Sequence, residues 1–211
     1  RADKDIAEKL KTLEVALEWL EAGNLVSTMP WTDDQKLHLR DSHLLTNKKF
    51  VYACNVSEDM MDASHDELQK MIWITDNDTQ IVPICAKLEE DMIEMSEDEK
   101  KEFLDDLWLI STGLDNLIKA SYDALGLQYY FTAWEQEVRA WTVKKWASAP
   151  QAAGVIHTDF EKWFIKADVV AASDIIEYKW WSWAREAGKV RLEGKQYIVQ
   201  DGDVMLFKFN N

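Results

Sequence analysis

The stretch KKFVYACNVSED, residues 48–59, determines the fold class that we expect for the chain. It contains an unbroken apolar run, Phe50 to Cys54, which ends in polar residues. A short apolar run without alternation is typical of a strand buried on both faces of a parallel sheet. A second such run, TQIVPICAKLEE at residues 79–90, follows a helical segment at 64–72. Strand, helix, strand and helix in this order predict an α/β fold.

Helical segments precede and follow this region. Residues 4–22 carry apolar side chains on one stripe and end before Gly23, and residues 33–45 form a second helix, so we expect a helical hairpin. The segment SEDEKKEFLDDL at 96–107 opens with the serine and glutamate spacing of a capping box. A further helix, 114–125, stops at a glycine, and we place a domain boundary there.

The remaining residues, 127–211, have a different pattern of predicted elements. A hairpin, a strand, a short helix and two further strands with Glu-Gly and Asp-Gly turns predict a small α+β domain. The segments concerned are QYYFTA and EVRAWTV for the hairpin, TDFEKWFIKADVV for the strand, SDIIEY for the helix, and VRLEGKQYIVQDGDVMLFKF for the last strands.

Charge divides the chain in the same place. The formal net charge is −15, whereas residues 127–211 contain 11 basic and 11 acidic side chains. All of the excess negative charge therefore lies in residues 1–126. Such an acidic part does not bind nucleic acid by neutralising phosphates, but the neutral part can contact RNA locally.

Several classes of protein are excluded or made less favourable by what the sequence lacks. It has no apolar run of membrane-spanning length, and no membrane partner is expected. Cys54 and Cys85 are the only cysteines, which argues against a disulfide scaffold and favours a reducing cytoplasm. No zinc-ligand spacing and no G-x-x-x-x-G-K-[ST] phosphate loop occur. The chain begins with Arg1 rather than Met, so we expect it to be part of a longer protein.

The end of the first predicted strand carries a candidate base-binding motif, Asn55-Val56-Ser57-Glu58. Ligands of open α/β sheets bind at the carboxyl ends of strands. There an asparagine amide can read a base edge, and an acid three residues later can accept from an amino group. Guanine-binding GTPases usually have Asn-Lys-x-Asp at this point, so Val56 and Glu58 should weaken selectivity for guanine. Taken alone, the motif is weak, and a strand-ending asparagine before a helix cap is its simpler interpretation.

The second strand ends in Cys85-Ala86-Lys87, which has the position of a second base-contacting loop. This signal is also weak alone. Cys54 and Cys85 can be neighbours on adjacent strands, and small buried apolar residues are the simpler interpretation of both.

Taken together, the order of the motifs resembles the C-terminal portion of the YchF/Obg-like ATPase family. The resemblance covers nearly the whole chain and is tightest from Asn55 onward. The stretches that carry it are NVSED, VPICAKLEED, EDEKKEFLDDL, LQYYFTAWEQEVRAWTV, APQAAGVIHTDFEKWFIKADVV and AREAGKVRLEGKQYIVQDGDVMLFKFN.

The resemblance implies three parts. Residues 1–46 would be the remnant of a helical, coiled-coil insertion. Residues 47–126 would be the second half of a P-loop nucleotide domain, and residues 127–211 a TGS domain with a β-grasp, ubiquitin-like fold. The phosphate loop and the Mg²⁺ ligands of the family are absent from the 211 residues.

The resemblance also implies a function. Family members hydrolyse ATP in preference to GTP, require Mg²⁺ and associate with ribosomes. Here Asn55, Val56 (through its backbone) and Glu58 would hold the base, and Cys85, Ala86 and Lys87 would form the second wall of its site. We expect a cytoplasmic monomer, without hydrolysis by this fragment alone.

A stand-alone module that binds RNA or the ribosome is the alternative function. Aromatic Phe160 and Phe164 lie near basic residues, although they are equally explained as core. The candidate contacts to the ribosome, its large subunit or its RNA are Lys144, Lys145, His157, Lys162 and Lys166.

The tryptophan content is unusual, with 11 Trp and only 7 Gly. The family has glycine where this chain has tryptophan at several positions, and Trp141 matches a family tryptophan. We therefore expect that most of the tryptophans are UGA codons in an organism that reads UGA as glycine. A tryptophan patch used for binding is the alternative. The glycine positions are 108, 134, 146, 163, 180 and 183, with 31, 73 and 181 as further cases.

Overall fold

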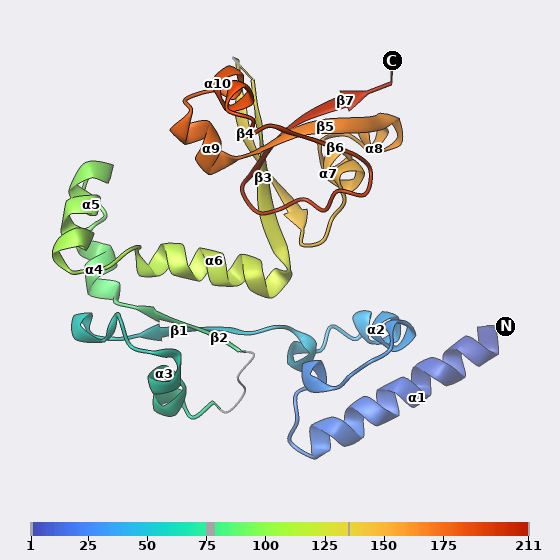
Figure 1. The fold of residues 1–211 in the computed structure, drawn as a ribbon. Coiled ribbons are helices and arrows are strands. Elements are labelled where there is room, and N and C mark those ends of the chain that lie inside the picture. Colours follow the sequence, from blue (N-terminus) through green and yellow to red (C-terminus); the bar gives the residue numbers. More distant parts are fainter. Residues whose placement is uncertain (1, 75–78, 135, 211) are drawn as a thin grey trace. The chain divides into compact units, whose positions relative to one another are not determined.

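The computed structural model describes residues 2–74, 79–134 and 136–210. The chain forms two compact units, Arg1–Leu117 and Ile118–Asn211, and each is described by itself (Figure 1). The division falls inside helix α6 (Gly113–Leu125), a few residues before the glycine at which the sequence suggested a boundary. No helix within the described ranges is long and apolar enough to cross a membrane.

The first unit begins with two packed helices. Helix α1 (Ala2–Glu21) contacts α2 (Asp33–Arg40), whose first turn is capped by Thr32 and Gln35. The second helix ends at Arg40 and is shorter than expected; a 3-10 turn, η2 (Leu45–Asn47), follows it. A small core lies under both helices and the 3-10 turn η1 (Val26–Thr28); its buried members are Ala16, Val26, Trp31 and Leu39.

Strands β1 (Val51–Asn55) and β2 (Gln80–Ile84) form a parallel pair, connected through α3 (His65–Ile72). The predicted strand–helix–strand order is therefore confirmed. The apolar run alone is typical of a strand buried on both faces, but Tyr52 and Ala53 of β1 are exposed. With only two strands paired, the sheet gives β1 too few neighbours to cover both of its faces.

Three helices follow β2, namely α4 (Ala86–Asp91), α5 (Glu97–Asp106) and α6. The predicted capping box of α5 is present: the Ser96 N–H and Oγ both donate to Glu99 Oε2, at 2.8 and 2.6 Å. The core beneath them includes Leu68, Leu88 and Met92.

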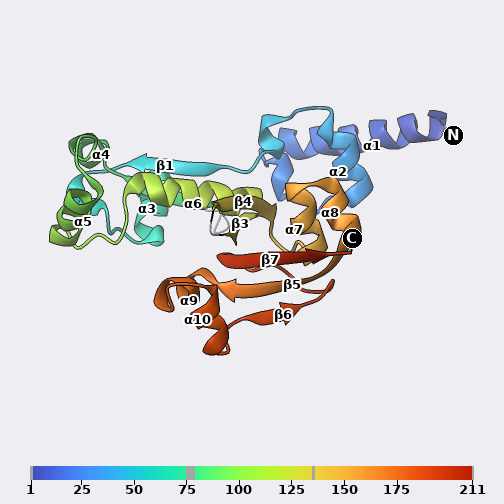
Figure 2. The same cartoon turned by 90° about the horizontal axis from the view of Figure 1, so that it is seen from above.

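The second unit is built on a five-stranded mixed sheet in the order β4-β3-β7-β5-β6 (Figure 2). The hairpin of β3 and β4 is antiparallel, as expected, and β3 pairs in parallel with β7. Strand β5 is antiparallel to both β7 and β6. The strands are β3 (Leu127–Ala133), β4 (Val138–Lys144), β5 (Phe164–Ala171), β6 (Arg191–Glu193) and β7 (Asp203–Phe209).

Helices cover both faces of this sheet. Alternate residues of one strand point to opposite faces, and accordingly Val169 belongs to one buried cluster and Val170 to another. The first cluster packs against α7 and the second against α9 and α10. The sequence did not predict α7, α8 or α10. The helices are α7 (Ala149–Ile156), α8 (Thr158–Trp163), α9 (Ala172–Glu177) and α10 (Trp181–Glu186).

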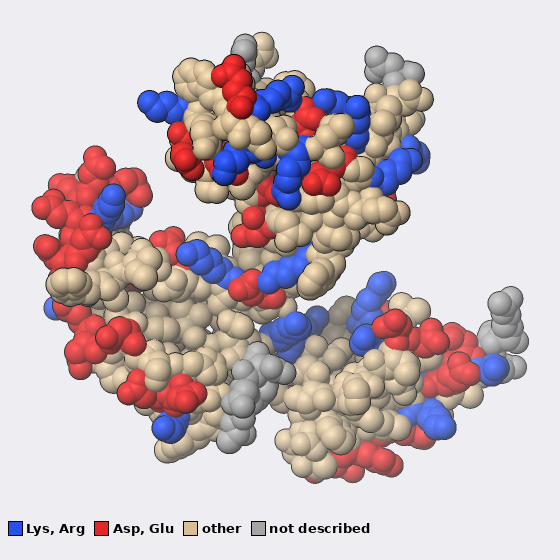
Figure 3. All heavy atoms as spheres, viewed as in Figure 1, with Lys and Arg blue, Asp and Glu red and all other residues tan. Residues whose placement is uncertain are grey.

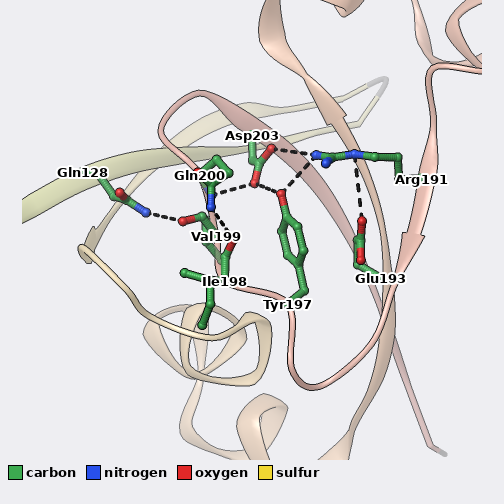
Figure 4. Close-up of polar contacts among 8 residues, drawn as sticks. All are labelled: Gln128, Arg191, Glu193, Tyr197, Ile198, Val199, Gln200 and Asp203. Carbon is green, nitrogen blue, oxygen red and sulfur yellow. Dashed lines mark hydrogen bonds and ion pairs between the residues drawn. The ribbon is translucent and has the colours of Figure 1, made fainter.

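A buried carboxylate fixes the loop before β7. Asp203 is 3% exposed and accepts from the Tyr197 hydroxyl at 2.7 Å and from the Gln200 N–H at 2.8 Å (Figure 4). The Arg191 guanidinium lies beside it at 3.4 Å. On the other side of the loop, Gln128 Nε2 donates to the Val199 carbonyl at 2.6 Å.

A second buried carboxylate, Asp168 on β5, is held by two cations. Arg185 Nη2 donates to Asp168 Oδ2 at 2.7 Å, and Lys208 Nζ donates to the same oxygen at 2.9 Å. A carboxylate removed from water must be paired in this way. The ion pairs therefore join β5, β7 and α10.

Candidate nucleotide-base site

The candidate base site lies where β1 and β2 end side by side. The register pairs Asn55 with Ile84, and the Val56 N–H donates to the Ile84 carbonyl at 2.8 Å. Because the strands are parallel, both carboxyl ends face the same edge of the sheet. The loops that begin at Val56 and Cys85 are therefore neighbours, although about 30 residues separate them.

The side chain of Asn55 joins the two loops. Its Oδ1 accepts a hydrogen bond from the Ala86 N–H at 3.2 Å. This N–H lies in the first turn of α4, where backbone donors have no partner within the helix. The bond fixes the amide at the mouth of the second loop. The Nδ2 group keeps two N–H donors that no described residue uses.

The other predicted residues surround this amide with different exposure. Val56 and Cys85 are buried, at 9% and 5% exposure. Glu58 begins the 3-10 turn η3 (Glu58–Met60) and is exposed, as are Ala86 and Lys87. The Asn55 amide and the Glu58 carboxylate are therefore both exposed to solvent.

Two residues that sequence reasoning missed support the second loop. Glu89 on α4 accepts from the Leu114 N–H at 3.2 Å. A Cβ at Gly113 would lie 3.0 Å from Glu89 Oε1 and 3.1 Å from the Ile84 Cα. Gly113 therefore allows the start of α6 to approach the end of β2. The signal in the sequence was Thr112 with Asp115 three residues later, an N-cap pair whose Asp115 N–H donates to Thr112 Oγ1 at 3.0 Å.

Cys54 and Cys85 are both free thiols. Both contact the core of the first unit, and burial raises the pKa of Cys54 above its ordinary value. A thiol with a raised pKa is less nucleophilic at neutral pH. The interpretation of both cysteines as small apolar residues is therefore favoured.

The arrangement can read the edge of a base and holds no metal centre. An amide N–H pair donates to ring nitrogens or carbonyl oxygens, and a carboxylate accepts from exocyclic amino groups. Across the parts of the chain that the structure describes, no three His, Cys, Asp or Glu side chains are grouped for metal binding.

The basic residues proposed for ribosome contact lie on or beside β4, α8 and β5 of the second unit. Lys144 ends β4 and is exposed, whereas Lys145 pairs with Asp123 at 2.7 Å. On α8, Lys162 pairs with Asp159 at 3.5 Å, and at its N-cap the His157 Nδ1 accepts from the Asp159 N–H. An exposed side chain on β5, Lys166, completes the set. Phe164 is fully buried and Phe160 packs beside it, so the core interpretation of both aromatic residues is confirmed.

Figure 3 shows the charge difference between the units. On the face shown, acidic side chains dominate the surface over α4 and α5, whereas basic and acidic side chains are interspersed over the second unit. Interspersed charge is compatible with a local polar contact, and it provides no broad basic face.

The tryptophans at 180, 181 and 183 lie in and beside α10 rather than in an open turn. The Trp181 indole N–H donates to the Ala133 carbonyl at 3.2 Å, and the ring packs in the second cluster of the sheet. Trp183 is half exposed. Together with Trp134, Trp180 and Trp181 line a shallow hollow of the second unit.

Known proteins resemble this chain in sequence. Residues 127–210 match the family model YchF-GTPase_C, described as a protein of unknown function (DUF933). Over 99% of its length the chain is 45% identical to "Ribosome-binding ATPase YchF" of Bacillus subtilis, and over 99% it is 44% identical to the protein of that name from Escherichia coli O157:H7. It is 39% identical to "Obg-like ATPase 1" of Caenorhabditis elegans, again over 99% of its length.

A solved structure agrees with the sequence comparison. The Schizosaccharomyces pombe YchF GTPase superposes with a TM-score of 0.76 at 32% identity, over 96% of this chain and 55% of that one. The chain spans 58%, 57% and 53% of the Bacillus, Escherichia and Caenorhabditis proteins. The matching region is their C-terminal part. Over nearly its whole length, the chain corresponds in sequence and fold to the C-terminal portion of proteins of the YchF/Obg-like ATPase family.

Proposed function

We propose that the chain is the base-recognising and ribosome-contacting part of a nucleoside-triphosphate hydrolase that uses ATP in preference to GTP. The observation that carries the proposal is the hydrogen bond from the Ala86 N–H to Asn55 Oδ1, which joins the two loops at the strand ends. The names of the relatives, ribosome-binding ATPase and Obg-like ATPase, support the same assignment.

The preference for ATP follows from the residues around Asn55. The guanine-selective pattern places a lysine at position 56 and an aspartate at position 58. Here position 56 is a buried valine, which contacts the ligand through its backbone, and Glu58 carries its carboxylate one methylene further out. Both changes remove features that select guanine. An exposed carboxylate remains to accept from the amino group of adenine.

Hydrolysis would require a preceding part of the protein. Phosphoryl transfer to water depends on a phosphate loop and on Mg²⁺, which neutralises the developing charge. The 211 residues contain neither the loop motif nor a group of ligands for the ion in their described ranges. We therefore expect residues 47–126 to act as the second half of a nucleotide domain. The purified chain alone should not turn over ATP.

The base site is tested in the intact protein expressed from the native gene. Asn55→Ala removes a neutral donor pair and should weaken ATP binding about 3- to 10-fold, while Glu58→Ala removes a charged acceptor and should weaken it about 10-fold or more. The matched control is Asp59→Ala, an exposed acid in the same 3-10 turn. The double change Val56→Lys with Glu58→Asp should move the affinity ratio toward GTP. Unchanged affinities in all site variants would refute the assignment.

We propose that residues 127–211 form the ribosome-contacting TGS domain, with a β-grasp fold. The five-stranded mixed sheet and α7 packed against it are compatible with this assignment. Its neutral balance and its exposed basic residues favour contact with RNA over the acidic first part. The helical residues 1–46 would be the remnant of the insertion. We propose a cytoplasmic monomer.

Ribosome contact is tested by co-sedimentation of the full chain with ribosomes. The double variant Lys144→Glu with Lys145→Glu should lose binding, whereas the charge-matched control Lys179→Glu with Lys195→Glu should retain it. Lys145 also pairs with Asp123 at 2.7 Å, so circular dichroism must show that the first variant is folded. If the chain binds ribosomes but the intact protein shows no response to nucleotide, the stand-alone module would be favoured. Equal binding by both variants would remove the lysines from the contact.

A further inference from the structure

Three tryptophans occupy a backbone conformation that favours glycine. Among the described residues, five that are not glycine have a positive φ, and three of these are Trp73, Trp108 and Trp146, at 55°, 58° and 70°. A positive φ brings the Cβ of an L-residue against its own backbone. A bulky residue in this region is an outlier, while glycine adopts it without cost.

Two of the three positions end helices in the way that glycines end helices elsewhere in the same chain. After α3, the N–H of the residue following Trp73 donates to the Gln69 carbonyl at 3.2 Å. After α5, the N–H following Trp108 donates to the Leu104 carbonyl at 2.9 Å. The same hydrogen bond, from an N–H to the carbonyl five residues earlier, closes α1 at Gly23 and α10 at Gly188, and both glycines have a positive φ. This is the Schellman end, whose left-handed residue is usually glycine.

The third position is a tight turn after β4. The N–H of the residue following Trp146 donates to the Lys144 carbonyl at 3.1 Å, and the Lys145 N–H donates to the Gly126 carbonyl at 2.8 Å. The turn is therefore fixed on both sides by backbone bonds. The residue between them must adopt the left-handed conformation.

The indole rings at these positions contribute no burial that would offset the backbone strain. Trp73, Trp108 and Trp146 are 90%, 93% and 83% exposed. Other tryptophans behave differently. Trp31 is 7% exposed and donates to the Val26 carbonyl at 2.7 Å, and Trp141 donates to Thr132 Oγ1 at 2.9 Å.

We infer that glycine is the natural residue at positions 73, 108 and 146, and that their codons are UGA, read as glycine in the source organism. Trp141 is a true tryptophan, and so is Trp31, for which the expectation of a glycine position was wrong, because the ring of each is buried or hydrogen-bonded. The remaining tryptophans expected at glycine positions lie outside the left-handed region, so the backbone does not extend the inference to them; they are Trp134, Trp163, Trp180, Trp181 and Trp183. The inference also removes the exposed tryptophans beside α3, α5 and β4 as a binding surface.

The backbone argument is tested by paired substitutions in the full 211-residue chain. Trp146→Gly should raise the urea midpoint of the second unit, and Trp108→Gly that of the first. Trp146→Ala and Trp108→Ala should raise it less or lower it, because alanine retains the strain at positive φ. Trp141→Gly should lower the midpoint. Equal gains for glycine and alanine would mean that only the exposed ring mattered, and would overturn the argument.

The codons and the native protein give the second test. Sequencing the gene should find UGA at positions 73, 108 and 146, and UGG at 31 and 141. Tandem mass spectrometry of the protein purified from its own organism should then find glycine at the three positions. UGG codons there, or tryptophan in the native peptides, would overturn the inference.

Discussion

The carboxylate of Asp203 should be a main support of the second unit, and its replacement gives the sharpest stability prediction. It is 3% exposed and accepts two short hydrogen bonds, from the Tyr197 hydroxyl and the Gln200 N–H (Figure 4). Asp203→Ala leaves both donors without their acceptor and Arg191 without its anion.

The magnitude follows from these bonds. A hydrogen bond to a charged group contributes about 1.5–3 kcal/mol, so the loss of two such bonds by Asp203→Ala should cost about 3–5 kcal/mol. Asp203→Asn keeps one acceptor but converts two charged bonds into neutral ones, each weaker by about 1 kcal/mol, so its loss should be about 2 kcal/mol. Tyr197→Phe removes one donor and should cost about 1 kcal/mol.

The same cluster predicts a dependence on alkaline pH. Burial, and then the hydrogen bond to Asp203, raise the pKa of Tyr197 to about 12, from an ordinary value of 10.0. The folded state therefore holds the phenolic proton more tightly than the unfolded state. This contribution to stability is complete below pH 10.0 and is lost as the pH rises toward about 12. Tyr129 and Tyr130 also have raised pKa values, so the comparison must be made between variants.

The assay is urea unfolding of the full chain, monitored by hydrogen exchange at the amides of β5 and β7. These strands lie in the second unit, so unfolding of the first unit does not enter the measurement. The losses should rank Tyr197→Phe, Asp203→Asn, Asp203→Ala, and the difference between Tyr197→Phe and the parent should shrink between pH 10 and 12. A change below about 0.5 kcal/mol for Asp203→Ala would refute the reasoning, because that is the range of neutral surface substitutions.

Two further predictions concern the first unit. Gly113→Ala should lower the urea midpoint of this unit, because the added Cβ meets Glu89 Oε1 at 3.0 Å and the Ile84 backbone at 3.1 Å. The control is Gly194→Ala, whose Cβ meets nothing within 4 Å. Equal effects of the two substitutions would contradict the close approach at Gly113. Ser96→Ala should cost about 1 kcal/mol of stability by removing the cap of α5. The hydrogen bonds from Ser96 lower the pKa of Glu99, so the contribution of this cap to stability is present above pH 4.5 and is lost as the pH falls below it. An acid titration monitored by circular dichroism should therefore show a smaller loss of stability in the variant than in the parent. Identical titrations would count against this cap.

Much of the fold was predictable because its signals are local. The alternation of apolar runs and helical stripes located β1, α3, β2 and α4, and the Ser96–Glu99 spacing located α5. Helix α7 was missed although it carries a local signal, since Gln151 accepts from the Ser148 N–H at 2.9 Å as in a capping box. No element was predicted for residues 149–156. Helix α10 was missed because three tryptophans at residues 180–183 obscured its pattern.

The features that the sequence did not predict depend on partners far along the chain. The register that places Asn55 opposite Ile84 sets which side chains meet at the strand ends. The burial of Asp168 depends on Lys208, 40 residues away, and no local pattern announces it. The exposed face of β1 does not follow from its apolar run, because the residues of one strand carry no information on how many strands pair with it. Asn55, Glu58 and Cys85–Lys87 could be proposed as a site from their positions at strand ends, but their joining through Ala86 needed the structure.

Amide hydrogen exchange in the intact protein, with and without ATP, tests the central claim that the ends of β1 and β2 form the base site. We predict that ATP slows exchange at Val56 and at Ala86–Lys87, and that GTP at the same concentration does so less. The Asn55→Ala variant should lose this protection, while Asp59→Ala should keep it. Binding of ATP without any protection of these two loops would contradict the claim.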